Sequence, residues 1–184
     1  GLRLVCDVLT GFNLKNEIKV IAVGKVFSGF HIARLLGIGA DLCYSARGMM
    51  MALGCVQSLI CNTNECPTGV ATQNESLIKG LVVTDKSQRV ANFHQGTVKA
   101  FMEIIAAAGL TDISQVNRTH LSRRIDQTFI KRFDELFPYL LPGSLLSEPY
   151  PKYLERDIKE ASADSFLPER CITHHDEGLV AINE

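Results

Sequence analysis

Three cysteines that lie within twelve residues are the first candidates for chemistry in this sequence. Cys55, Cys61 and Cys66 follow a C-x5-C-x4-C pattern, and Pro67 comes directly after the third cysteine. Thiolates hold iron–sulfur clusters, and a cysteine followed by proline recurs at such sites. Three ligands in one stretch suit a three-iron cluster, whereas structural zinc requires four ligands and no nearby histidine supplies the fourth. The pattern therefore indicates a metal or cluster site.

The cysteine spacing leaves two alternatives open. Cys43 lies upstream on an expected strand and could act as a fourth thiol, although nothing in the spacing requires it. The cysteines could instead be unligated, because free cysteine is often buried. Cys55 fits that alternative, since we expect it on the face of an apolar helix over residues 49–59. Cys61 and Cys66 fit it poorly, because they lie in a loop rich in Asn, Thr and Pro.

A second group of candidate residues follows two expected strands. Gly24 comes after the first strand, and Ser45, Ala46, Arg47 and Gly48 come after the second. Exposed backbone N–H groups at adjacent strand ends, beside a helix N-terminus, make a phosphate cradle. Glycine lets the backbone approach an anion closely, and arginine offers a forked donor that is always charged. The same residues are also compatible with an ordinary turn and a helix-surface arginine.

A βαβ unit would bring these strand ends together. Residues 18–23 and 40–44 read as short strands, and the first of them is rich in β-branched residues. Ser28 can cap a helix between them, which Gly37 or Gly39 would end. Two strands joined by a helix over about 27 residues should be parallel, so their carboxyl ends should meet at one edge of the sheet.

The rest of the chain reads as helical and then irregular. We expect a helix over residues 2–9, a polar loop over residues 61–73, and a long helix from Thr84 or Asp85 to about Gly109. The apolar stripe of the long helix, spaced by three and four, predicts core packing and comprises Val90, Phe93, Thr97, Phe101, Ile104 and Ala108. Short helices are predicted over residues 112–116, 121–125 and 128–137. Prolines recur from residue 138 onward, which predicts an irregular tail.

Composition excludes several classes of protein. The 184 residues carry a net charge of −1 and are 46% hydrophobic, so the chain can build a core and lacks the basic excess of a nucleic-acid binder. No apolar run approaches the roughly 18 residues of a membrane span, and no signal peptide is evident. Six cysteines, of which three are clustered and three are scattered over 184 residues, do not resemble the short, cysteine-dense scaffold of a secreted disulfide protein. We therefore expect no nucleic-acid or membrane partner and a reducing, cytoplasmic setting.

Residues 39–73, which read GADLCYSARGMMMALGCVQSLICNTNECPTGVATQ, carry a resemblance to a known family. They resemble the FMN-binding domain of glutamate synthase, and are most similar to stand-alone FMN-binding glutamate synthase-related proteins. The resemblance extends through VIAVGK at residues 20–25 and VTDKSQRVANFH at residues 83–94. It covers most of residues 1 to about 140 and fades beyond them.

The resemblance implies a chemistry and assigns residues to it. The family domain is a (β/α)8 barrel that converts 2-oxoglutarate and ammonia, including glutamine-derived ammonia, to glutamate through 2-iminoglutarate, with hydride from reduced FMN. Electrons arrive through a [3Fe-4S] cluster from ferredoxin or an NAD(P)H-oxidising subunit. The residues that match the cluster ligands are Cys55, Cys61 and Cys66. The residues that match the loops around the FMN phosphate are Gly24, Ser45, Ala46 and Arg47, with Lys25 replacing a more usual glycine.

We accordingly expect an α/β fold that is the C-terminal part of a (β/α)8 TIM barrel, namely its last two βα units, followed by a mostly helical C-terminal extension. The expected divisions are residues 1–83 for the barrel units with the cysteine loop, 84–140 for the extension, and 141–184 for a Pro-rich tail. A complete barrel needs roughly 250 residues. The other strands, with the catalytic residues, are expected in a missing N-terminal part of the same barrel. The alternatives are a non-catalytic iron–sulfur module for electron transfer and a metal-free fragment with inert cysteines.

Overall fold

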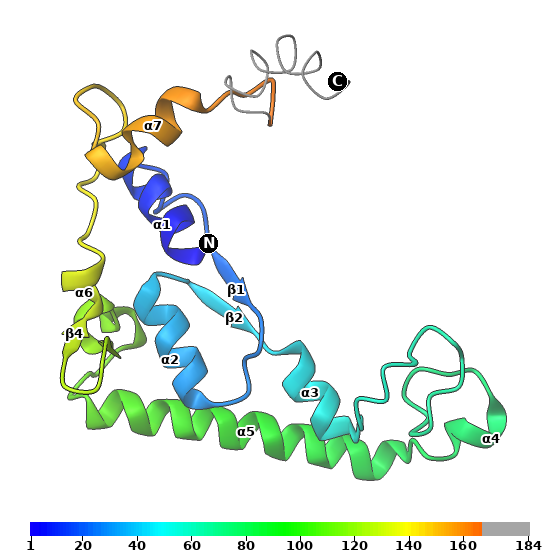
Figure 1. Ribbon diagram of the computed structural model, residues 1–184. Coiled ribbons are helices and arrows are strands. Elements are labelled where there is room, and N and C mark those ends of the chain that lie inside the picture. Colours follow the sequence, from blue (N-terminus) through cyan, green and yellow to red (C-terminus); the bar gives the residue numbers. More distant parts are fainter. Residues whose placement is uncertain (167–184) are drawn as a thin grey trace, which may run out of the picture.

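The computed structural model describes residues 1–166, which form a mixed α/β fold with seven α-helices and two two-stranded sheets (Figure 1). In chain order the elements are α1 (Leu2–Gly11), β1 (Ile21–Val23), α2 (Gly29–Ile38), β2 (Leu42–Tyr44), α3 (Ala46–Leu53), α4 (Glu75–Ile78), α5 (Val83–Ala107), the 3-10 turns η1 (Ile113–Gln115) and η2 (Arg118–His120), β3 (Ser122–Arg124), β4 (Ile130–Arg132), α6 (Phe133–Leu136) and α7 (Lys152–Glu160).

The expected βαβ unit is confirmed. β1 and β2 pair in parallel, and the register places Val23 opposite Tyr44 at their carboxyl ends. Helix α2 follows Ser28 at its N-cap and ends at Gly39, whose φ of +130° suits glycine. Each strand is only three residues long, shorter than predicted. The two loops that leave the strands therefore begin at the same edge of the sheet.

The long helix α5 supports the rest of the fold, and α2 and α3 pack along it (Figure 1). Its core with α2 consists of Ala33, Phe101, Ile105 and Val116. Gly29 allows this packing, because a Cβ there would lie 2.4 Å from the backbone nitrogen of Phe101. The predicted stripe is covered from Val90 to Ile104, whereas Ala108 is exposed at the end of the helix. The cysteine loop and α4 lie beyond one end of α5, and α6 and η2 lie near the other.

Two of the predicted short helices are wrong. Residues 122–124 and 130–132 form the strands of an antiparallel hairpin, β3 with β4, and α6 covers only the four residues that follow. The cause lies at Asp126, whose carboxylate accepts hydrogen bonds from the N–H groups of Thr128 and Phe129, at 2.8 and 2.9 Å. This Asx-type turn reverses the chain where a helix would have continued. The helix predicted over residues 112–116 is present as the 3-10 turn η1.

The tail predicted to be irregular also contains regular structure. Helix α7 forms within residues 141–166 and packs against α1. The buried residues of this second core are Leu140, Leu145 and Leu154, and Val8, Phe12, Tyr150 and Ile158 pack around them. The prolines therefore shape a connection that returns to the N-terminal helix. Residues 167–184, including Cys171, lie outside the described part of the chain.

A buried ion pair joins the two halves of the sequence. The guanidinium of Arg118 donates to the carboxylate of Asp7 on α1, and the side chains are 3% and 4% exposed. Arg118 also donates to the backbone carbonyls of Phe137 and Pro138, at 3.0 and 3.3 Å. The guanidinium of Arg3, which is partly exposed to solvent, lies 3.2 Å from the same carboxylate. One guanidinium thus holds α1, η2 and the segment after α6 in contact.

Candidate functional site

The residues predicted to surround a phosphate do lie at one edge of the β1–β2 pair. Gly24 and Lys25 follow β1, while Ser45 follows β2 at the next position in register. Gly24 has a φ of +123°, a conformation that favours glycine, and its α-carbon faces open space, with no atom within 4 Å of an added Cβ. Lys25 has a φ of +51° and is exposed. An anion could therefore approach this turn directly.

Ser45 links the two strand-end loops. Its hydroxyl donates a 2.6 Å hydrogen bond to the carbonyl of Val26. Gly48 allows the contact, because a Cβ there would lie 2.7 Å from the Ser45 hydroxyl oxygen. The hydroxyl proton is therefore committed within the protein, and Ser45 does not cap α3 with its side chain. The backbone N–H groups at the start of α3 are therefore left without a side-chain cap and could bind an anion.

Arg47 places an exposed, positively charged side chain at this edge. It lies in the first turn of α3, and its side chain is exposed together with that of Ala46. Within residues 1–166 no ion pair or hydrogen bond occupies its guanidinium. A free guanidinium beside uncapped helix N–H groups can form charge-assisted, bidentate bonds to a phosphate.

The first cysteine of the C-x5-C-x4-C stretch lies outside the helix that precedes it. The helix predicted over residues 49–59 ends at Leu53, because Gly54 adopts the left-handed conformation that terminates helices. The N–H of Cys55 still bonds to the carbonyl of Met50, at 3.0 Å. Cys55 is half-buried and Cys61 is exposed. Both thiols thus lie on the polar loop rather than on an apolar helix face.

Cys66 occupies a backbone nest that stabilises its thiolate. Its sulfur lies 3.4 Å from the hydroxyl of Thr68, and the residue is 7% exposed. Hydrogen bonds from the Thr68 side chain and from the N–H groups of Ala71, Thr68 and Val70 lower the pKa of this thiol to about 7, from 9.0. Burial instead raises the pKa of the Cys43 thiol on β2. The surroundings of Cys66 therefore favour its thiolate, whereas those of Cys43 favour its neutral thiol.

The three thiols are the right donors for an iron–sulfur cluster, and a thiolate held by several N–H groups is typical of such ligands. Their sulfurs are not gathered, however: within residues 1–166 no three His, Cys, Asp or Glu side chains are placed to hold a metal ion. Gln57 and Leu59, between the first two cysteines, have φ of +56° and +61°, and both are exposed. Left-handed backbone is unfavourable for these residues and is not held here by packing. The backbone between Cys55 and Cys61 is therefore exposed and locally strained.

Sequence reasoning missed the residues that hold the cysteine loop in shape. Asn64 and Thr72 fasten residues 64–73, Thr68 bonds to the Cys66 sulfur, and Gly69 passes against α4. A Cβ on Gly69, whose φ is +74°, would lie 2.4 Å from the carbonyl oxygen of Leu77. The Pro67-Thr68-Gly69 sequence is a turn signal that could have revealed this position. The side-chain bonds of Asn64 carry no such signal.

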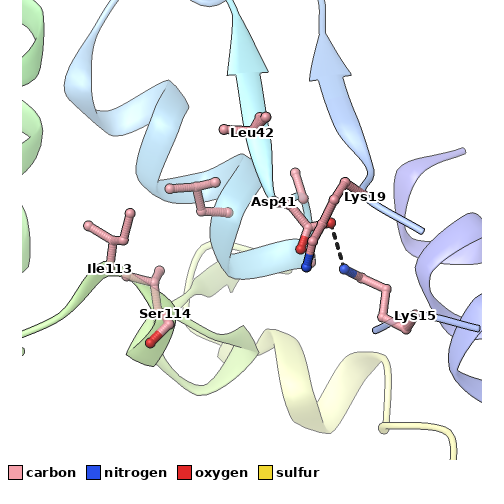
Figure 2. Close-up of a pocket in the computed structure, with 10 residues that line it drawn as sticks. Lys15, Lys19, Asp41, Leu42, Ile113 and Ser114 are labelled. Atoms are coloured by element: carbon pink, nitrogen blue, oxygen red, sulfur yellow. Dashed lines mark hydrogen bonds and ion pairs between the residues drawn. The ribbon is translucent and has the colours of Figure 1, made fainter. Parts of the chain in front are cut away.

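A separate cavity of about 580 Å³ lies at the opposite end of β2 (Figure 2). There Asp41 accepts hydrogen bonds from the Lys15 ammonium and the Val20 N–H, both at 2.7 Å. Burial alone would raise the pKa of the Asp41 carboxyl, but these bonds outweigh it and lower that pKa. The charges of Lys15 and Asp41 thus satisfy each other, and the residues that line the cavity belong to neither predicted site.

Comparison with known proteins decides the family. The profile described as "conserved region in glutamate synthase" matches residues 1–111, which contain all eight predicted site residues. The chain belongs to the glutamate synthase family. It is 36% identical over 136 residues to the glutamate synthase large subunit-like protein YerD of Bacillus subtilis, covering 74% of this chain and 26% of that protein.

Two further glutamate synthases extend the comparison. An archaeal glutamate synthase (NADPH) of Methanocaldococcus jannaschii is 34% identical over 110 residues, covering 59% of this chain and 22% of the relative. The ferredoxin-dependent glutamate synthase 2, chloroplastic, of Arabidopsis thaliana is 30% identical over 172 residues, which cover 91% of this chain and 10% of the relative. The chain thus spans about a quarter or less of the length of these glutamate synthases. Across residues 1–166, no helix is long and apolar enough to cross a membrane.

Proposed function

We propose that this chain forms the C-terminal part of a glutamate synthase domain that makes L-glutamate from 2-oxoglutarate and ammonia. In this proposal β1 and β2 are the last two strands of a (β/α)8 barrel. FMN, when bound, supplies the hydride that reduces 2-iminoglutarate. The flavin-ring and 2-oxoglutarate contacts belong to strands outside residues 1–184, so this chain alone should not make glutamate.

The strand-end edge would hold the phosphate of FMN. The support is its geometry: an open glycine turn, the uncapped start of α3, and the free guanidinium of Arg47. Gly24 and Lys25 would contribute backbone N–H groups, and the Ser45 hydroxyl would keep the two loops in register. Ala46 contributes its backbone and leaves room at the helix start.

The observation that carries the proposal is the nest around Cys66. A thiol with a pKa of about 7 lies in a C-x5-C-x4-C-Pro loop, directly after the strand-end edge, in a chain of this family. Cys55, Cys61 and Cys66 would hold a [3Fe-4S] cluster once the segment between the first two cysteines moves toward the nest. Relatives include ferredoxin-dependent and NADPH or NADH enzymes, so ferredoxin or an NAD(P)H-oxidising subunit is the proposed electron donor.

FMN titration of the complete barrel, in which this chain is joined to its N-terminal part, tests the phosphate assignment by flavin fluorescence. Arg47→Ala should weaken binding by about tenfold or more, the value of one charge-assisted hydrogen bond. Arg34→Ala is the matched control, because Arg34 is also exposed on a helix and makes no ion pair within residues 1–166. Equal affinity in wild type and Arg47→Ala would move the phosphate elsewhere.

A second candidate is an iron–sulfur module that serves electron transfer without binding FMN. The observation that favours it is the nest around Cys66, which is formed by residues of this chain alone, whereas the proposed flavin site needs strands from outside it. Iron binding without measurable FMN binding, in this chain and in the complete barrel, would favour this candidate over the first.

A further inference from the structure

The cysteine loop is fastened by a hydrogen-bonded clasp between Asn64 and residues 72–73. The Asn64 side-chain oxygen accepts from the Gln73 N–H at 2.6 Å, and the Asn64 backbone carbonyl accepts from the Thr72 hydroxyl at 2.5 Å. The same hydroxyl accepts from the Asn74 N–H at 3.0 Å. Asn74 in turn caps α4 through its side chain. We call the bonds between Asn64 and residues 72–73 the Asn64 clasp.

The Asn64 clasp lies beside two of the three cysteines, Cys61 and Cys66. It closes the segment that contains Cys66, and the N–H of Ala71 that bonds to the Cys66 sulfur immediately precedes Thr72. On its other side, a small cavity of about 320 Å³ is lined by Cys61, Asn62, Asn64, Ala71, Thr72 and Gln73. The clasp residues therefore line the cavity beside Cys61 and also close the segment that carries Cys66.

Asparagine suits this position for two reasons. Asn64 has a φ of +67°, and asparagine tolerates the left-handed region better than most residues. In the clasp it also acts only as an acceptor, through its side-chain and backbone oxygens. An aspartate would preserve the acceptor geometry, whereas a glycine would keep the backbone conformation and lose the side-chain bond.

We propose that Asn64 is a positioning residue for the cluster: its clasp closes the segment that carries Cys66 and holds that thiol in place before iron arrives, so that Cys55 and Cys61 are the thiols that must move. This inference rests on the proposed function, because it assigns a role toward the proposed cluster. The clasp itself belongs to the iron-free chain, where it can be measured directly.

The experiment compares wild type with Asn64→Gly, Asn64→Asp and the control Asn62→Gly. Asn62 lines the same cavity but makes no hydrogen bond within the described residues. In the iron-free protein, Asn64→Gly should speed hydrogen exchange of the Gln73 amide by about tenfold, while Asn64→Asp and Asn62→Gly should not. After anaerobic reconstitution with iron and sulfide, Asn64→Gly alone should retain less than half of the wild-type iron.

The outcomes separate the two claims. If wild type and Asn64→Gly retain equal iron with equal rates of loss, the positioning role is refuted and the cluster assignment stands. Unchanged exchange at Gln73 in Asn64→Gly would show that no clasp exists. If wild type itself takes up no iron, the proposed cluster fails, and the positioning role fails with it.

Discussion

Replacing Arg118 with methionine should be among the most damaging single changes in this chain. The substitution keeps an unbranched side chain of similar length but removes the guanidinium that pairs with Asp7. Asp7 would then be a carboxylate only 4% exposed, and the carbonyls of Phe137 and Pro138 would lose a donor. Breaking a buried pair by removing one partner costs about 3–5 kcal/mol. Because Arg3 still approaches Asp7 at 3.2 Å, we expect the lower end, about 3 kcal/mol.

Urea unfolding followed by far-UV circular dichroism measures this cost, since the sequence has no tryptophan for fluorescence. The control is Arg156→Ala, which removes an arginine 70% exposed and should change the free energy of unfolding by less than about 1 kcal/mol. The double variant Asp7→Leu with Arg118→Met should be more stable than Arg118→Met alone, because no charge is left buried without a partner. A cost below 1 kcal/mol for Arg118→Met, or a double variant less stable than the single, would refute the reasoning.

Three other predictions follow from the loop and the sheet. Gly69→Ala should destabilise the chain by about 1–2 kcal/mol through its positive φ and the 2.4 Å approach to Leu77, whereas Gly96→Ala, in open space within α5, should stabilise it by about 0.5–1 kcal/mol; thermal unfolding compares the two. In the iron-free chain, site-resolved alkylation of Cys66 should reach half its maximal rate at about pH 7, and a midpoint near 9 would contradict the nest. The pKa of Asp41 in the folded chain lies below its unfolded value of about 3.9, so the hydrogen bonds of its carboxylate stabilise the fold above that pH. This stabilisation is lost as the pH falls through the lower, folded pKa, and the stability advantage of wild type over Asp41→Asn should disappear with it. An advantage that stays unchanged down to pH 2 would be inconsistent with this prediction.

Elements defined by local patterns were predictable from the sequence. The β-branched run before Gly24 and the glycine that ends α2 marked the βαβ unit, because each acts on its immediate neighbours; Ser28 is the N-cap residue as predicted, but its side chain makes no capping hydrogen bond. The 25-residue helix α5 was predictable for the same reason, through its apolar stripe. The family resemblance, carried by residues 39–73, is confirmed by the matched region.

What could not be predicted depends on contacts across the sequence or on competition between local signals. The hairpin after η2 forms because the Asp126 carboxylate accepts hydrogen bonds from two backbone N–H groups. A helical spacing of apolar residues does not reveal these bonds. Helix α3 ends at Gly54, where apolar periodicity alone predicted continuation. The Asp7–Arg118 pair spans 111 positions, and the Asn64 clasp involves residues whose types suggest only a loop.

The central claim is that Cys55, Cys61 and Cys66 hold one three-iron cluster. Anaerobic reconstitution, followed by iron and sulfide analysis of wild type and of single serine variants, tests it most directly. We predict about three irons and four sulfides per chain, loss of iron in each of the three serine variants, and no change in Cys43→Ser, whose thiol is kept neutral by burial. Bound zinc, no metal at all, or a dependence on Cys43 equal to that on Cys66 would contradict the account.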